Sequence, residues 1–149
     1  MRTVWTRKGL RWQQPNIHEI LGIGLRAWTE PTSGKEDIGV TRLWRILGSE
    51  SAYMVWKLRC ERTIGHSDQD GWEHSARTVR NKWVHSINAR LILDRAMTHK
   101  RFGRSALSQD VALKTWRGTL ENEEDLTDDW IKTRVLVGIA PGIPQWDPG

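Results

Sequence analysis

The chain has 149 residues, with 23 Lys and Arg against 18 Asp and Glu, a formal net charge of +5 and a sequence pI of about 9.8. This length fits a single domain that buries a sizeable core, and the basic balance favours acidic partners such as nucleic acid. The single cysteine excludes an intramolecular disulfide, and without a signal-peptide core or an apolar run of ~20 residues we expect an intracellular protein with no membrane segment.

The first 39 residues are predicted to form only short helices and a connection. Residues 1–8 are typical of a short helix that begins without a cap. Asn16 is followed three residues later by Glu19, which is close to a capping box and predicts a helix over residues 17–22. Residues 25–39 show no hydrophobic periodicity, so we expect an exposed connection there.

The clearest helix is predicted over residues 40–64, because apolar side chains recur there with helical spacing. One face carries Val40, Leu43, Trp44, Leu47, Met54, Val55 and Leu58, and the nearly opposite face carries Ile46, Tyr53, Trp56, Cys60 and Ile64. Two apolar faces predict a helix that is packed on both sides. The strip between them, with Glu50, Lys57 and Glu61, is expected to be solvated.

Four further elements follow the polar linker 66–73. A second long helix is predicted over about 75–102, where Val79, Trp83, Ile87 and Leu91 recur every fourth residue. A third helix begins near Ser108 and runs to Leu120. Thr127 could cap a short turn around Trp130, and residues 135–139 are the best candidate for a strand.

These elements predict a mainly α fold, namely a small irregular helical array with two long helices, long loops and at most one short strand near the C-terminus. Within this single module we expect a loosely packed N-terminal part (1–39), a helical core (40–122), and an acidic segment with an irregular tail (123–149). The core is expected around three tryptophans, Trp44, Trp56 and Trp83.

Two possible metal sites are weak. The carboxylates gather at Glu121, Glu123, Glu124, Asp125, Asp128 and Asp129. Such a run near a helix end is more typical of a solvated segment than of a two-metal centre. Cys60, His66 and His74 lack the paired spacing of a zinc site, and Cys60 lies among apolar positions, where we expect a small buried hydrophobe.

Cofactor and catalytic motifs are also missing from the pattern. Gly22, Gly24 and Ala27 match the spacing of a dinucleotide fingerprint, but the strand that should precede it and the helix that should begin within it are not predicted. We therefore expect no metal, no cofactor and no enzyme activity.

Basic charge is the more informative feature. Between Ala76 and Arg104 eight cations oppose only Asp94, which leaves +7. Such a helix could neutralise nucleic-acid phosphates, with tryptophans nearby to stack on bases, although a solvated helix face explains the charge equally well. The predicted nucleic-acid-binding residues are Arg77, Arg80, Lys82, Arg90, Arg95, Lys100, Arg101 and Arg104.

Several blocks of the chain are distinctive in combination. They are residues 49–53 (SESAY), 56–62 (WKLRCER), 83–91 (WVHSINARL), 113–116 (LKTW), 128–130 (DDW) and 135–139 (VLVGI). Together they resemble the C-terminal tail of non-LTR retrotransposon polyproteins of mushroom-forming fungi. The resemblance implies a piece that lies after reverse transcriptase and ribonuclease H domains, and hence a truncated remnant without their catalytic aspartates.

Three functions follow as hypotheses. The first is a non-catalytic accessory segment of a retroelement-derived protein that contacts RNA or DNA through the basic helix. The second is a structural segment whose two-faced helix docks onto upstream reverse transcriptase or ribonuclease H domains. An inert truncated remnant is the further alternative. The third is a remnant hydrolase with nuclease activity, which the lack of a converging carboxylate set disfavours.

Overall fold

The computed structural model describes residues 1–139, which are mainly helical, as the sequence predicts. The α-helices are α1 (Arg2–Arg7), α2 (Ile17–Leu21), α3 (Ile38–Cys60), α4 (Ala76–Met97) and α5 (Gln109–Trp116). The π-helical turn η1 (Glu61–Gly65) extends α3, and the 3-10 turns are η2 (Lys100–Ser105), η3 (Glu123–Asp125) and η4 (Trp130–Lys132).

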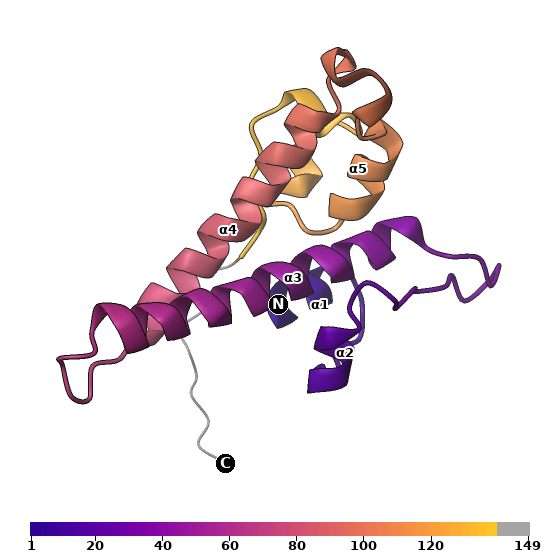
Figure 1. Ribbon diagram of the computed structural model, residues 1–149. Coiled ribbons are helices and arrows are strands. Elements are labelled where there is room, and N and C mark those ends of the chain that lie inside the picture. The colour runs from indigo at the N-terminus through magenta and orange to yellow at the C-terminus, as the bar shows by residue number, and fades with distance from the viewer. Residues whose placement is uncertain (140–149) are drawn as a thin grey trace.

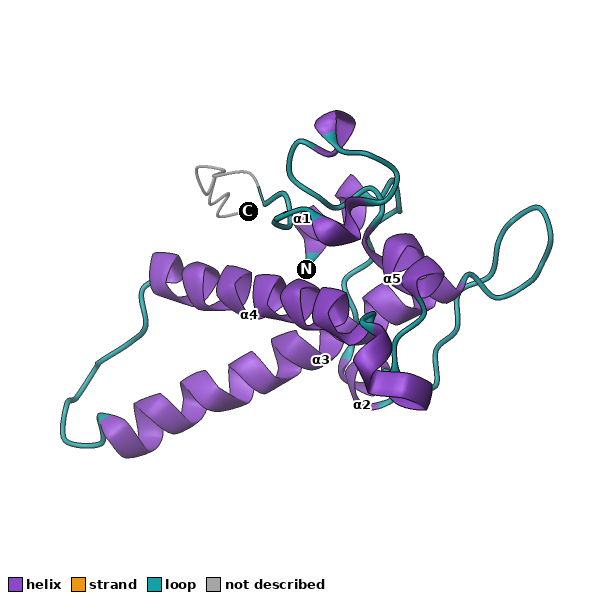
Figure 2. Ribbon diagram, turned by 90° about the horizontal axis from the view of Figure 1, so that it is seen from above, coloured by secondary structure: helices purple, strands orange, loops and turns teal. Residues whose placement is uncertain are grey.

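The two long helices, α3 and α4, form an antiparallel hairpin that opens like a V (Figures 1 and 2). Helix α5 lies in the opening between them and packs mainly on α3, and α1 packs behind the V (Figure 1). The closed end of the hairpin projects away from the other helices, and we call its residues 51–86 the arm. The open end, beyond Met97 on α4, carries η2.

Side chains at the helix starts explain where the long helices begin. Asp37 accepts the amide of Val40 at 2.9 Å at the start of α3, and Ser75 accepts the amide of Thr78 at 3.1 Å at the start of α4. The predicted capping box of α2 is confirmed, because Asn16 and Glu19 each accept the other's backbone amide at 3.0 Å.

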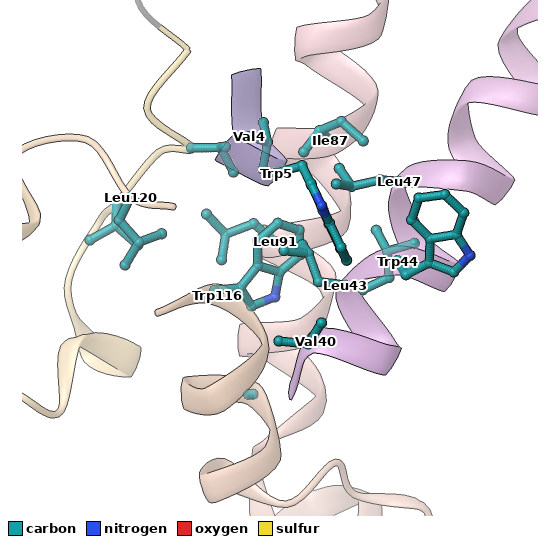
Figure 3. Close-up of a cluster of buried hydrophobic side chains, with 14 of the residues drawn as sticks. Val4, Trp5, Val40, Leu43, Trp44, Leu47, Ile87, Leu91, Trp116 and Leu120 are labelled. Atoms are coloured by element: carbon teal, nitrogen blue, oxygen red, sulfur yellow. The ribbon is translucent and has the colours of Figure 1, made fainter. Parts of the chain in front are cut away.

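The core lies where α1, α3, α4 and α5 meet (Figure 3). Trp5 is 1% exposed, and its ring centroid lies 5.0 Å from that of Trp28 and 5.4 Å from that of Trp44. Its indole N–H donates to the carbonyl of Arg11 at 3.1 Å. The loose packing expected for the N-terminal part is therefore wrong for α1, which is too short to show a periodic pattern yet contributes the central aromatic ring.

The three tryptophans predicted for the core differ in burial. Trp44 is buried, Trp83 is half-buried, and Trp56 is 59% exposed. Trp56 lies on the arm, which α5 does not reach, so the prediction that it belongs to the core is wrong. Trp116 of α5, fully buried against α3 and α4, takes that place.

The second apolar face of α3 is uncovered on the arm, whereas Ile46, nearer the start of the helix, is buried in the core. Tyr53 and Ile64 on this face are 56% and 76% exposed, and Cys60 is only half-buried. The predictions of a helix packed on both sides and of a buried Cys60 are therefore wrong for the arm. The amphipathic spacing identifies two apolar faces, but it does not show whether a neighbouring element covers each of them.

Residues 135–139 run along α4 as an extended segment and do not form a strand. Their pairing with the chain before them is one bridge, Leu120 with Val137, and the amide of Val137 donates to the side chain of Asn88 at 2.8 Å. Two short extended segments without a third strand are too few for a stable sheet. Residues 135–139 instead pack against α4.

A charged group is enclosed where α3, α4 and α5 converge. Asp94 is 3% exposed and accepts two hydrogen bonds from Arg42, at 2.5 and 2.7 Å, and one from the Trp116 indole at 2.8 Å. Close packing of α3 on α5 depends on Gly39, where a Cβ would lie 2.5 Å from the carbonyl oxygen of Lys114. The Asp94 hydrogen bonds and the close contact at Gly39 together hold α3, α4 and α5 at this junction.

Candidate nucleic-acid interface

The structure divides the eight predicted cations into three groups. Three of them belong to the arm: Arg77 is exposed, Arg80 lines an apolar groove between α3 and α4, and Lys82 forms an ion pair with Glu61 at 2.5 Å. Glu61 therefore offsets one charge of the basic helix, and these three residues do not form one surface.

Arg90 alone makes up the second group, because it and Arg95, which belongs to the third group, lie on opposite sides of α4. Arg90 lines a small pocket against α3, whereas Arg95 points toward the C-terminal segment and donates its Nε–H to the carbonyl of Ile131 at 2.9 Å. Helical geometry explains the separation, because five residues turn the side chain by about 140°.

The third group gathers at the open end of the V. Arg95, Lys100 and Arg101 line a groove of about 490 Å³ between the end of α4, η2 and η4, which we call the tip groove. Arg104 is exposed on the same 3-10 turn. The complete lining is Arg95, Ala96, Thr98, His99, Lys100, Arg101, Gln109, Ile131 and Lys132.

Local structure fixes the turn that presents these cations. His99 caps η2, with Nδ1 accepting the amide of Arg101 at 3.1 Å, so a neutral imidazole carries its proton on Nε2. The Arg101 guanidinium lies 4.8 Å from the ring centroid of Phe102. Gly103 has a φ of 53°, a left-handed conformation that favours glycine and turns the chain back toward α5.

The charge of the tip groove is strongly positive. Four lining side chains are basic, Arg95, Lys100, Arg101 and Lys132, and no carboxylate belongs to the described residues that line it. The nearest carboxylate shown by a contact is that of Asp129, which accepts from Gln109 Nε2 at 2.7 Å. Four clustered cations concentrate a positive potential that attracts phosphates.

Sequence reasoning missed two members of the tip groove, Lys132 and His99. Lys132 lies 32 positions after Lys100 and outside the segment of high charge, so only the path of the chain from α5 back along α4 brings it there. His99 appeared isolated because its partner is a backbone amide.

The acidic segment has a structural use in the described residues. Glu123 accepts the amides of Gly118 at 2.7 Å and Leu120 at 3.0 Å and closes the turn after α5. In residues 1–139 no group of three or more His, Cys, Asp or Glu side chains is arranged to hold a metal ion. Over the same residues, every helix is too short or too polar to cross a membrane.

Comparisons with protein-family models, curated proteins and solved structures give no match to this chain. The resemblance to retrotransposon polyproteins therefore stays a prediction, and the functional argument depends on the site itself.

Proposed function

We propose that this chain is a non-catalytic accessory module that binds the phosphate backbone of RNA or DNA through the tip groove. The origin that best fits this function is the one implied by the sequence resemblance, the C-terminal part of a retroelement protein. The observation that carries the proposal is the convergence of four cations, from α4, η2 and η4, on one groove with no carboxylate in its lining.

Several features favour a binding surface over a merely solvated helix face. The cations come from segments 32 residues apart and share one concave surface, whereas a solvated face would place them along one helix. Arg95 is half-buried and anchored to the Ile131 carbonyl, and the Phe102 ring supports Arg101. A cation held in place loses less entropy on contacting a phosphate.

The test compares two variants with the same change of net charge. The tip variant carries K100Q, R101Q and K132Q, and the arm variant carries R59Q, R62Q and R77Q, all exposed on the helical hairpin. Anisotropy of a short labelled single-stranded RNA at low salt should show the tip variant binding at least about tenfold more weakly than the arm variant.

Equal losses in the two variants would mean that net charge alone attracts RNA, and a larger loss in the arm variant would move the site to the arm. Either result contradicts the proposal. Unchanged far-ultraviolet circular dichroism in both variants is the control for folding.

A second candidate function, docking to neighbouring domains, is favoured by the exposed apolar side chains of the arm. Val55 and Trp56 are 68% and 59% exposed, more than expected for large apolar side chains gathered on one helix. The double variant V55T and W56Q should reduce binding of a hydrophobic dye and any self-association, without lowering the unfolding temperature. Dye binding equal to that of the wild type would show that the arm is not the apolar surface that binds the dye.

A further inference from the structure

A second cationic pocket lies on the other side of α4. It has a volume of about 220 Å³ and is lined by Arg42, Arg45, Ile46, Ser49, Glu50 and Arg90. Three arginines from two helices thus face one small space, which is separate from the tip groove because Arg90 and Arg95 lie on opposite sides of α4.

One donor of a residue that lines this pocket has no acceptor. The Nε atom of Arg90 is buried, and within residues 1–139 it has no hydrogen-bond partner. A charged donor taken out of water without an acceptor is costly, so such groups in proteins are nearly always satisfied by protein, water or a ligand.

The carboxylates near the pocket are already engaged. Glu50 accepts the hydroxyl of Ser86 at 2.5 Å, and Asp94 is shared by Arg42 and the Trp116 indole. The Arg42 charge is therefore balanced by Asp94, while Arg45 and Arg90 together exceed the charge of Glu50 by one. The pocket retains one positive charge and a buried donor.

We propose that this pocket is an oxyanion site that takes a single phosphate group. A planar guanidinium offers two donors to a tetrahedral oxyanion, which matches the orphan Nε–H of Arg90. The volume accommodates a phosphate with some water but is too small for a drug-sized ligand. This site goes beyond the proposed function and does not depend on the tip groove.

The test is a titration of the full chain with inorganic phosphate at constant ionic strength, followed by the Nε–Hε signals of the arginine side chains. The Arg90 signal should shift and saturate with phosphate but not with chloride. R90Q should weaken phosphate binding about tenfold or more, R90K should restore part of it, and R59Q, an exposed position outside both cationic sites, should leave it unchanged.

A shift that is linear and equal for phosphate and chloride, or full binding retained in R90Q, would overturn the proposal. Melting of each variant by circular dichroism separates lost binding from lost folding. The source of the phosphate is then decided by adding a short single-stranded oligonucleotide. Displacement of the bound phosphate identifies a nucleic-acid backbone as its natural ligand, and no displacement identifies a free phosphate.

An oligonucleotide that binds R90Q and wild type equally, while phosphate binds only wild type, would leave the tip groove intact as the nucleic-acid site. Conversely, phosphate binding unchanged by K100Q, R101Q and K132Q, in a variant that no longer binds RNA, keeps the two sites distinct. The failure of one proposal is thus distinguishable from the failure of the other.

Discussion

Asp94 is an acidic side chain with 3% of its surface exposed, and Arg42 and Trp116 hold it at the junction of three helices. Replacing it by Asn should lower the free energy of unfolding by about 3 kcal/mol, because the Arg42 charge then loses its partner. Urea denaturation measures the change, and D110N, which breaks an exposed pair with Lys114, is the matched control. Equal effects of the two substitutions would contradict this account of the junction.

Lys8 connects α1 to the end of α5. Its ammonium donates to the carbonyls of Lys114, Thr115 and Arg117 at 2.7, 3.2 and 2.8 Å. Burial lowers the pKa of Lys8 to about 8, so the group is still mainly protonated at pH 7.

The substitution K8M keeps the apolar stem but leaves the three carbonyls without their donor. We expect a loss of about 1 kcal/mol in urea denaturation at pH 7, because the cost of burying the charge, which lowers the pKa of Lys8, offsets part of the hydrogen bonds. The control is K35M in the exposed loop before α3, which should leave the midpoint unchanged. If K8M is as stable as K35M, the cap contributes nothing.

At the scale of single residues, the sequence reveals what is local. The capping box of Asn16 and Glu19 and the start of α4 near Ser75 are local features in which prediction and structure agree, whereas Asp37, the cap of α3, lies in the segment predicted as an exposed connection. The burial of Trp5 depends on residues that lie 23 or more positions later, and no spacing rule anticipates it.

An ion pair between Lys82 of α4 and Glu61 of η1 connects the two helical segments of the arm. Lys82 hydrogen bonds to Glu61 and lowers the pKa of that carboxyl, with His74 and Lys57 adding to the effect. A lowered acidic pKa stabilises the folded state above the ordinary Glu value of roughly 4.3, and this contribution is lost as the pH falls.

Amide hydrogen exchange in the arm should therefore differ most between wild type and E61Q near neutral pH. The difference should shrink as the pH falls below the ordinary Glu value and Glu61 becomes protonated. A difference that stays constant as the pH is lowered would show that the pair with Lys82 does not hold the arm closed. Exchange in α5, which is remote from the pair, serves as the internal control.

The elements themselves were largely predictable, since helical periodicity located α3, α4 and α5 within a few residues. Their environment was not. Amphipathic spacing gave α3 two apolar faces, but which of them is covered depends on where α5 and α1 pack, and the face bearing Trp56 is left open. The same limit applies to charge, because spacing along α4 does not reveal that Glu61 faces Lys82 or that Lys132 joins Lys100.

For the whole molecule, the V of α3 and α4 separates two kinds of surface. The arm presents exposed apolar side chains, and the open end presents the cations of the tip groove. The arm and the open end lie at opposite ends of α4 (Figure 1). A phosphate-binding surface of this kind predicts affinity that falls steeply with salt, because each neutralised phosphate releases counterions.

The most direct test of the central claim is the salt dependence of binding to single-stranded RNA, in wild type and in the tip variant K100Q, R101Q and K132Q. Each phosphate contact contributes roughly 0.7 to the slope of log affinity against log salt, so losing three contacts should reduce that slope by about 2. A wild-type chain that does not bind RNA at low salt, or a tip variant with an unchanged slope, would contradict nucleic-acid binding at the tip groove.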